Sequence, residues 1–174
     1  MRRLSLSALL LCAISAPAAQ AAEVVALGAS NTFGRGRGST PDGVSPGQAY
    51  PAQLERLLQS QGCRVRVQNA GIAGNTTGQM LARLGGVLGK DTRVLILQPG
   101  GNDQRRGEGG DRSANIAEIR KRAAARGIKV VMLDSLGQIA RAHRLSDGQH
   151  YSAQGHAQFA AYLAPLVKAA GACR

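Results

Sequence analysis

The sequence "EVVALGASNTFG" (residues 23–34) decides how the rest of the chain is interpreted. Its first half is a short apolar run that ends at Gly28, a pattern that predicts a buried β-strand. Gly, Pro, Ser and Asp are frequent over residues 31–48, which indicates a loop. Ser30 lies where the strand ends and is either a turn residue or a nucleophile. A nucleophilic serine requires a base, a group that orients the base, and donors for an oxyanion elsewhere in the chain.

Strand and helix patterns alternate through the remaining sequence. The other expected strands cover residues 64–71, 93–97 and 128–134, and the expected helices cover residues 49–62, 76–88, 114–127 and 153–171. Ser113 and Ser152 are expected to cap the last two helices, and Glu118 and Arg122 to pair within the first of these. Apolar strands between helices indicate an α/β fold whose parallel sheet is covered on both faces. Right-handed crossovers then predict a doubly wound sheet.

The N-terminus has the pattern of a secretory signal peptide. Arg2 and Arg3 precede an apolar stretch over residues 4–14, and the sequence Ala-Gln-Ala at positions 19–21 has the small residues of a cleavage site at its first and third positions. We expect cleavage near Ala21, a single domain over residues 22–174, and a periplasmic or secreted protein. No later stretch is apolar and long enough to span a bilayer.

Two cysteines, Cys63 and Cys173, remain after the expected cleavage. An oxidising compartment permits them to pair, although the sequence alone leaves two free thiols as an alternative. Cys63 precedes a strand and therefore lies at the end of the sheet where the strands begin. The last helix is expected to start near the end where the strands finish, which is where ligands of such sheets bind, and to run to the opposite end. On this topology both cysteines lie at the opposite end, which predicts a disulfide.

The charge of the chain is strongly positive. The formal net charge of the 174 residues is +12, and loss of Arg2 and Arg3 lowers it by two. Such a surplus favours contact with anionic surfaces such as phospholipid. The chain has no Trp and only 3% aromatic residues, so it offers few stacking platforms for single-stranded nucleic acid. We expect no specific nucleic-acid binding and no cofactor, and the oligomeric state is left open.

Polar residues gather where the expected strands end. Ser30, Gly74 and Asn102 follow the first three strands, and Asp147 and His150 lie three residues apart near the C-terminus. The carboxyl ends of parallel strands meet at one edge of a sheet, where ligands bind. Taken alone, each of these positions is more often an ordinary turn residue. Together they supply a nucleophile, a base with its carboxylate, and oxyanion donors, which are the parts for acyl transfer.

At these positions the chain resembles the SGNH hydrolases, also called GDSL esterases and lipases. Gly28-Ala29-Ser30-Asn31 stands where the family usually has Gly-Asp-Ser-Leu, and the Asn-x-Gly block is matched over residues 69–74. The Gly-x-Asn-Asp block is matched in full by residues 100–103, and Asp-x-x-His by residues 147–150. The blocks occur in the family's order and cover nearly all of the mature chain. Within the family, the chain resembles members of the thioesterase and lysophospholipase type.

The resemblance implies a three-layer α/β/α, flavodoxin-like fold and metal-free hydrolysis of esters or thioesters. It implies that Ser30 attacks the acyl carbon, that His150 transfers the proton, and that Asp147 holds the imidazole. It also implies an oxyanion hole formed by Ser30, Gly74 and Asn102. Small-molecule, lipid and glycan esters all fit this machinery.

Two departures from the family pattern affect these expectations. Ala29 and Asn31 replace the Asp and Leu of the first block, which predicts the loss of a hydrogen bond that steadies the loop. Only residues 135–146 separate the last strand from Asp147, where the family usually has another helix and strand. We therefore expect a sheet of about four parallel strands, with one side of the site open and suited to a small acyl group.

Other titratable residues offer competing interpretations. His156 lies within the last helix without an acid three residues before it, and His143 lies on an expected short helix, so both are interpreted as packing or surface histidines. Asp134 is interpreted as a helix cap. Four arginines follow the strand-end loops and either attract an anionic group on the substrate or form a solvated face. They are Arg35, Arg37, Arg105 and Arg106.

Besides the nucleic-acid binding set aside above, a rival fold and a rival function compete with an SGNH esterase. An α/β-hydrolase requires a Gly-x-Ser-x-Gly elbow, but Thr32 occupies the position of the final glycine and Ser30 follows the first strand. A non-catalytic SGNH-fold protein that binds carbohydrate or anionic surfaces remains the alternative.

Overall fold

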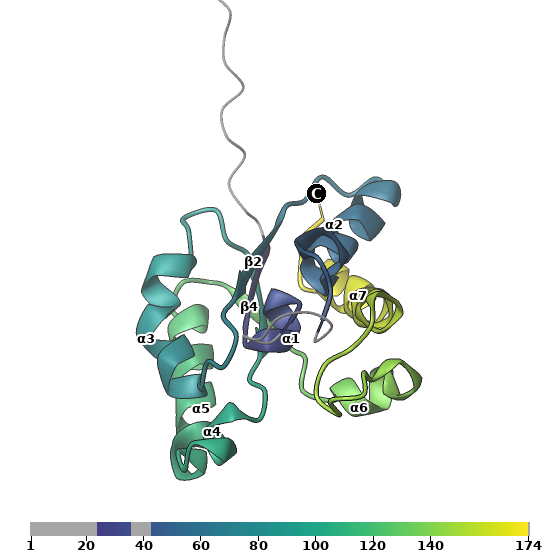
Figure 1. Cartoon of the computed structure of the whole chain (residues 1–174). Coiled ribbons are helices and arrows are strands. Elements are labelled where there is room, and N and C mark those ends of the chain that lie inside the picture. The colour runs from purple at the N-terminus through teal and green to yellow at the C-terminus, as the bar shows by residue number, and fades with distance from the viewer. Residues whose placement is uncertain (1–23, 36–42, 174) are drawn as a thin grey trace, which may run out of the picture.

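The computed structural model describes residues 24–35 and 43–173 (Figure 1). Four strands form one sheet in which every neighbouring pair is parallel. The order is β2-β1-β3-β4, the flavodoxin-like order ending at a fourth strand. The strands are β1 (Val24–Gly28), β2 (Val67–Gly71), β3 (Val94–Gln98) and β4 (Lys129–Met132). The predicted α/β class and the strand number are confirmed, whereas the expected signal peptide, residues 1–21, lies outside the described residues.

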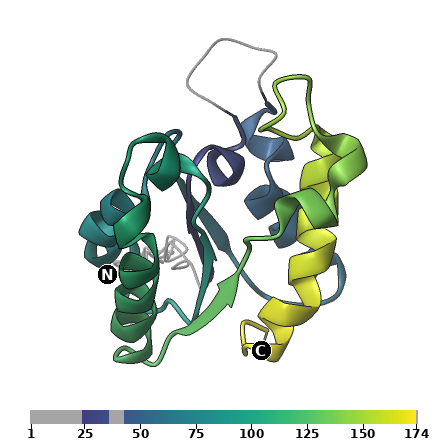
Figure 2. The ribbon, with the colours of Figure 1, turned by 90° about the horizontal axis from the view of Figure 1, so that it is seen from below.

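Helices cover both faces of the sheet and complete the expected three layers (Figure 2). On one face α2 (Tyr50–Ser60) packs against α7 (Ala153–Ala169), and on the other α3 (Thr77–Val87) packs against α5 (Arg112–Ala124). Shorter helices lie in the connections between these elements. They are α1 (Ser30–Phe33), α4 (Asn102–Arg105), α6 (Leu136–Ile139) and three 3-10 turns at Pro46–Gln48, Gly109–Asp111 and Arg141–His143.

The central strands are apolar because they are buried on both sides. In β1, Val24 and Ala26 belong to the core shared with α2 and α7, whereas Val25 and Leu27 belong to the core shared with α3 and α5. All residues of β1 and β3 are buried. This two-sided burial explains why these strands show no apolar–polar alternation in the sequence.

Two of the predicted helix caps are wrong and one is confirmed. Helix α5 begins at Arg112 with Asp111 as its N-cap, because a 3-10 turn leads directly into it, so Ser113 lies inside the first turn. Ser135, and not Asp134, is the N-cap of α6. Ser152 caps α7, and its side chain accepts a hydrogen bond from the Gly155 N–H at 3.4 Å.

The predicted ion pair within α5 is confirmed. Arg122 Nε lies 2.8 Å from Glu118 Oε1, one helical turn away.

No helix in the described part of the chain combines the length and the hydropathy needed to cross a membrane.

A disulfide joins Cys63 and Cys173, as predicted, with their Cα atoms 5.0 Å apart. Cys63 precedes β2, and Cys173 follows α7 close to the C-terminus, at the end of the sheet away from α1 (Figure 2). The bond closes a separation of 110 residues. It therefore ties one helix layer to the sheet at the end opposite the loops that follow the strands.

Candidate active site

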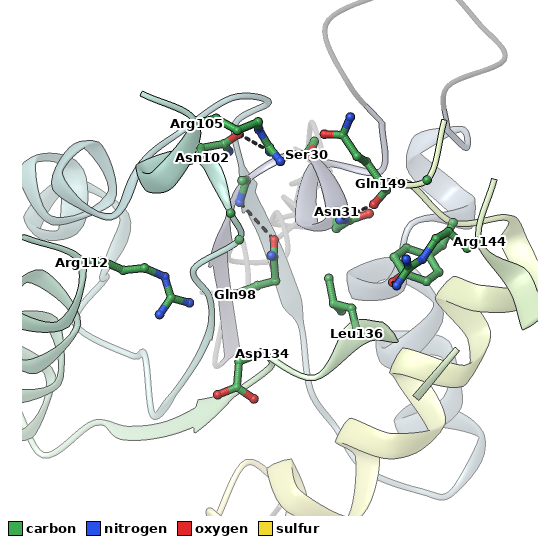
Figure 3. Close-up of a pocket in the computed structure, with 15 residues that line it drawn as sticks. Ser30, Asn31, Gln98, Asn102, Arg105, Arg112, Asp134, Leu136, Arg144 and Gln149 are labelled. Carbon is green, nitrogen blue, oxygen red and sulfur yellow. Dashed lines mark hydrogen bonds between the residues drawn. The ribbon is translucent and has the colours of Figure 1, made fainter. Parts of the chain in front are cut away.

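The candidate site lies at the carboxyl ends of β1 and β3, the two adjacent strands at which the strand order reverses. Such a switch point is where doubly wound sheets bind ligands, because the two flanking loops diverge there. Ser30 begins α1 directly after β1, and Asn102 begins α4 after β3. Both line a cavity of about 250 Å³ (Figure 3). The structure therefore brings the predicted nucleophile and one predicted oxyanion donor to the same hollow.

Ser30 is held by a tight connection between β1 and α1. Any side chain at Gly28 would clash with Thr32 Oγ1 and approach the Gln98 carbonyl, so only glycine permits this close packing. Gly34 ends α1 with a φ of 116°, a conformation that favours glycine. The Ser30 hydroxyl forms no hydrogen bond with any residue in the described ranges. It is therefore free to interact with a base or a substrate.

Gln98, the last residue of β3, anchors the loop that carries Ser30. Its buried Oε1 accepts hydrogen bonds from the Ala29 N–H and from Thr32 Oγ1, both at 3.2 Å. Thr32 Oγ1 also lies 3.1 Å from the Tyr50 hydroxyl, and burial raises the pKa of Tyr50 far above its usual value, so the phenol stays protonated. The carboxylate missing at Ala29 is thus offset by an amide from the neighbouring strand. Sequence reasoning missed Gln98, although a polar residue at the end of an apolar run was a usable signal.

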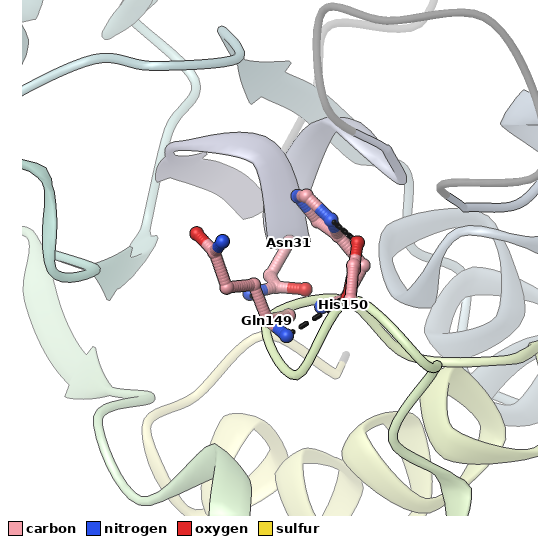
Figure 4. A network of polar contacts seen from close by, with 4 residues as sticks. Asn31, Gln149 and His150 are labelled. Carbon is pink, nitrogen blue, oxygen red and sulfur yellow. Dashed lines mark hydrogen bonds and ion pairs between the residues drawn. The ribbon is translucent and has the colours of Figure 1, made fainter.

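Asp147 and His150 form the hydrogen-bonded pair that was predicted. Asp147 Oδ2 lies 2.5 Å from His150 Nδ1, and Asp147 Oδ1 accepts from the backbone N–H groups of Gln149 and His150 at 2.8 and 2.9 Å (Figure 4). Burial raises the pKa of Asp147, but these hydrogen bonds and the His150 ring outweigh it and lower the pKa to about 2. The carboxylate is ionised at neutral pH and fixes the Nδ1 side of the imidazole, leaving Nε2 for other contacts.

A side-chain contact joins the histidine loop to the serine helix. Asn31 Nδ2 donates to the Gln149 carbonyl at 3.1 Å, so the residue after Ser30 is tied to the residue before His150 (Figure 4). Asn31 is the residue that replaces the usual leucine, and its role was not foreseen from the sequence. His150 and Gly74 are not among the residues that line the cavity. The Asn31–Gln149 hydrogen bond is therefore the connection that the structure provides between the serine and the histidine.

The predicted oxyanion donors are held in fixed orientations. Asn102 is buried, its Nδ2 donates to the Asn75 carbonyl at 2.8 Å, and its Oδ1 accepts from Arg105 Nη2 at 2.6 Å. One N–H of the amide is used in this way and the second remains available. Gly74 has a φ of 78°, which a residue with a side chain rarely adopts. The N–H groups of Ser30 and Gly74 donate to no residue within the described ranges.

Arg83 contacts the loop that follows β2 and carries Gly74. Its Nε donates to Asn75 Oδ1 at 2.8 Å, and its Nη2 donates to the Gly28 carbonyl at 3.1 Å. Burial lowers the pKa of the Arg83 guanidinium from its usual value. One side chain therefore links the end of β1 to the loop after β2.

The two histidines set aside from the sequence do not enter the site. His156 is fully buried, its Nδ1 accepts from the Tyr50 N–H at 3.2 Å, and its ring stacks with that of Tyr50. Burial lowers the pKa of His156 to about 4, with a further contribution from the charge of His150, so it is a neutral packing residue at pH 7. His143 lies half-buried in a 3-10 turn.

Charged residues from distant parts of the chain reach the cavity. Of the four arginines singled out in the sequence, Arg105 lines it, Arg35 and Arg106 do not, and Arg37 lies outside the described residues. The segment between β4 and Asp147 contributes Asp134, Leu136 and Arg144 to the lining. These residues therefore line the side of the site that we expected to be open. Arg112, at the start of α5, is a further lining residue that the sequence did not indicate.

The family model for GDSL-like lipases and acylhydrolases matches residues 26–173. The esterase TesA of Pseudomonas aeruginosa is 36% identical over 93 residues, a match that covers 52% of this chain and 46% of that protein. The chain thus aligns with about half the length of this curated relative.

Solved structures share the fold. A crystal structure of TesA superimposes with a TM-score of 0.72 at 21% identity, covering 84% of this chain and 98% of the other. The psychrotrophic esterase EstA from Pseudoalteromonas sp. superimposes with a TM-score of 0.63 at 15% identity, covering 84% and 92%. The family model accounts for nearly all of the described residues, and the family is one of carboxylic ester hydrolases. The chain belongs to the GDSL-like lipase/acylhydrolase family, the SGNH hydrolases.

Proposed function

We propose that the protein is an exported serine esterase that hydrolyses carboxylic esters or thioesters. The observation that carries this proposal is the Asp147–His150 pair, in which an ionised carboxylate fixes an imidazole in the loop that Asn31 ties to the serine helix. A carboxylate on Nδ1 favours the tautomer whose Nε2 accepts a proton, which is the state a general base requires.

The reaction follows from the roles of these groups. Ser30 Oγ attacks the acyl carbon while His150 Nε2 takes its proton, and Asp147 stabilises the imidazolium that results. The N–H groups of Ser30 and Gly74 and the Asn102 amide donate to the oxyanion as it forms. His150 then protonates the departing alcohol or thiol. A water molecule activated by His150 releases the acyl group from Ser30 in the second half of the reaction.

Two backbone groups make the oxyanion hole plausible on physical grounds. The Ser30 and Gly74 N–H groups have no acceptor among the described residues, as is usual for Ser30 at the start of a helix, and both are therefore available to a bound oxyanion. The third donor, Asn102, is oriented by Asn75 and Arg105 before any substrate binds. Donors that need no reorientation stabilise charge as it develops in the transition state.

Export is supported by the disulfide as well as by the N-terminal sequence. Disulfides persist in the periplasm and outside the cell and are rare in the cytosol. We propose that residues 1–21 are a signal peptide, that residues 22–174 form the hydrolase domain, and that the protein acts on small-molecule, lipid or glycan esters. The positive charge of the chain supports contact with anionic surfaces.

A fluorophosphonate probe and para-nitrophenyl acetate test the proposed function. The wild-type protein is expected to hydrolyse the ester and to be labelled at Ser30, and Ser30→Ala is expected to lose both properties. Ser60→Ala, which changes an exposed serine on α2, is the matched control and keeps both. Labelling that persists in Ser30→Ala would refute the assignment. A folded wild-type protein that neither reacts nor hydrolyses any ester would support the non-catalytic alternative.

A further inference from the structure

The cavity beside Ser30 has a strongly basic lining. Arg105, Arg112 and Arg144 come from three different segments and are arranged around it, and Asp134 is the one acidic residue among the described residues of the lining (Figure 3). None of these arginines forms an ion pair with a residue in the described ranges. The cavity wall therefore carries an excess of positive charge that the part of the protein described here does not neutralise.

The three arginines differ in the contacts that their side chains already make within the protein. Arg105 donates to the side chain of Asn102 and therefore has a positioning role at the proposed oxyanion hole. Arg144 Nη2 donates to the Tyr151 hydroxyl at 3.3 Å, and its guanidinium lies 5.8 Å from the centre of that ring. Arg112 is half-buried, and its side chain makes no hydrogen bond with a described residue. Arg112 and Arg144 thus keep donors for a bound molecule.

The rest of the lining is mostly polar. Gln98 contributes an amide whose Nε2 has no partner among the described residues, and Asn31 and Gln149 add further polar groups. The apolar side chains of the lining are those of Ala29 and Leu136, with the ring of Tyr151. A cavity of about 250 Å³ with such polar walls offers little apolar surface against which a long acyl chain could be buried.

The basic lining extends into a second cavity of about 650 Å³. This cavity shares Asp134 and Arg144 with the first and adds Arg141. Clefts lined by one sign of charge focus the electrostatic potential and concentrate ligands of the opposite charge. Guanidinium groups are also well suited to carboxylates, because their planar N–H donors match the two oxygens.

We propose that the cavity selects esters that carry an anionic group on their acyl or alcohol part, and that Arg112 and Arg144 determine this preference. The inference rests on the proposed function, since it places the anion next to the ester that Ser30 attacks. It narrows the substrate class from esters in general to short, polar, negatively charged ones.

Two pairs of substrates test the proposal and distinguish the two positions of the charge. Para-acetoxybenzoate and its neutral amide, para-acetoxybenzamide, differ in the alcohol part. Mono-para-nitrophenyl adipate and para-nitrophenyl hexanoate differ in the acyl part. In at least one pair the wild-type protein is expected to show a higher kcat/KM for the anionic ester, and the ratio is expected to fall as salt screens the charges.

Variants assign the preference to particular residues. Arg112→Gln and Arg144→Gln are each expected to lower the ratio of anionic to neutral kcat/KM by about three- to tenfold, as for loss of a partly exposed charged hydrogen bond. Arg120→Gln removes an exposed arginine from the same helix as Arg112, away from the cavity, and is expected to leave the ratio unchanged. Comparing ratios cancels differences in intrinsic reactivity between the esters.

The outcomes separate this inference from the proposed function. Equal ratios in the wild type, Arg112→Gln and Arg144→Gln would overturn the inference, whereas hydrolysis of the neutral esters would still support the esterase. Calorimetry on Ser30→Ala provides a measurement that needs no turnover. Tighter binding of the anionic ester than of its neutral counterpart in either pair, weakened by adding Arg112→Gln, supports the anion site even if the esterase proposal fails, and equal binding within both pairs overturns it.

Discussion

Replacing Asn102 by alanine separates an oxyanion donor from a turn residue. Asn102→Ala removes one of three proposed donors, while the Ser30 and Gly74 N–H groups remain. Loss of one oxyanion donor typically lowers kcat by about 10²- to 10³-fold, which corresponds to roughly 3–4 kcal/mol. Because the interaction strengthens as the carbonyl becomes an oxyanion, KM is expected to change much less than kcat.

The structure also predicts a cost in stability. Asn102 is buried, and its amide donates to the Asn75 carbonyl and accepts from Arg105. Alanine leaves the Asn75 carbonyl without that donor, and an unsatisfied buried group costs about 1–3 kcal/mol. Water that enters from the cavity reduces this cost, so we expect the free energy of unfolding to fall by about 1–2 kcal/mol.

The assay combines steady-state kinetics on para-nitrophenyl acetate with urea unfolding. Rates are expressed per folded molecule, so that the loss of stability does not appear as a loss of kcat. Gln104→Ala changes an exposed residue of the same short helix and is expected to alter neither quantity. If Asn102→Ala retains the wild-type kcat per folded molecule, Asn102 is only a structural residue and the oxyanion-hole assignment is wrong.

Three further predictions concern the surroundings of the site. The pKa of Asp147 is lowered from 3.8 to about 2 on folding, so its contribution to stability is present above pH 4 and is lost as the pH falls toward 2. Asp147→Asn should flatten this part of the pH dependence of unfolding, and an unchanged profile would contradict the pairing with His150. Gln98→Met leaves the Ala29 N–H and the Thr32 hydroxyl without their acceptor, and should lower both the melting temperature and kcat. A wild-type kcat in folded Gln98→Met would show that this residue does not position Ser30. Replacing both disulfide cysteines by serine should lower the free energy of unfolding by about 5 kcal/mol on the chain-entropy model, with kcat per folded molecule unchanged because the bond lies at the far end of the sheet. A loss of less than 1 kcal/mol in urea unfolding would refute that estimate.

Local sequence patterns were sufficient for the architecture. The apolar run in β3, from Val94 to Leu97, predicts a strand buried on both faces whatever its partners are, because it leaves no polar face for water. Alternation of strands and helices then leaves a parallel sheet as the natural arrangement, and the strand ends collect Ser30, Asn102 and the Asp147–His150 turn at one edge. The spacing of Asp147 and His150 is itself local, so their hydrogen bond could be predicted without a fold.

Contacts between distant segments depended on the tertiary structure. Gln98 holds Ala29 across 69 residues, and Asn31 reaches Gln149 across 118 residues, so no local pattern could reveal either contact. The same is true of Arg112 and Arg144, which look like solvated helix and loop residues until the chain packs them around the cavity. The sequence by itself determined the layers, the parallel sheet and the chemical groups at its edge, because periodicity and short spacings encode them. Only the tertiary structure decided which distant side chains anchor the serine loop and line the cavity, because those contacts depend on strand order and helix packing.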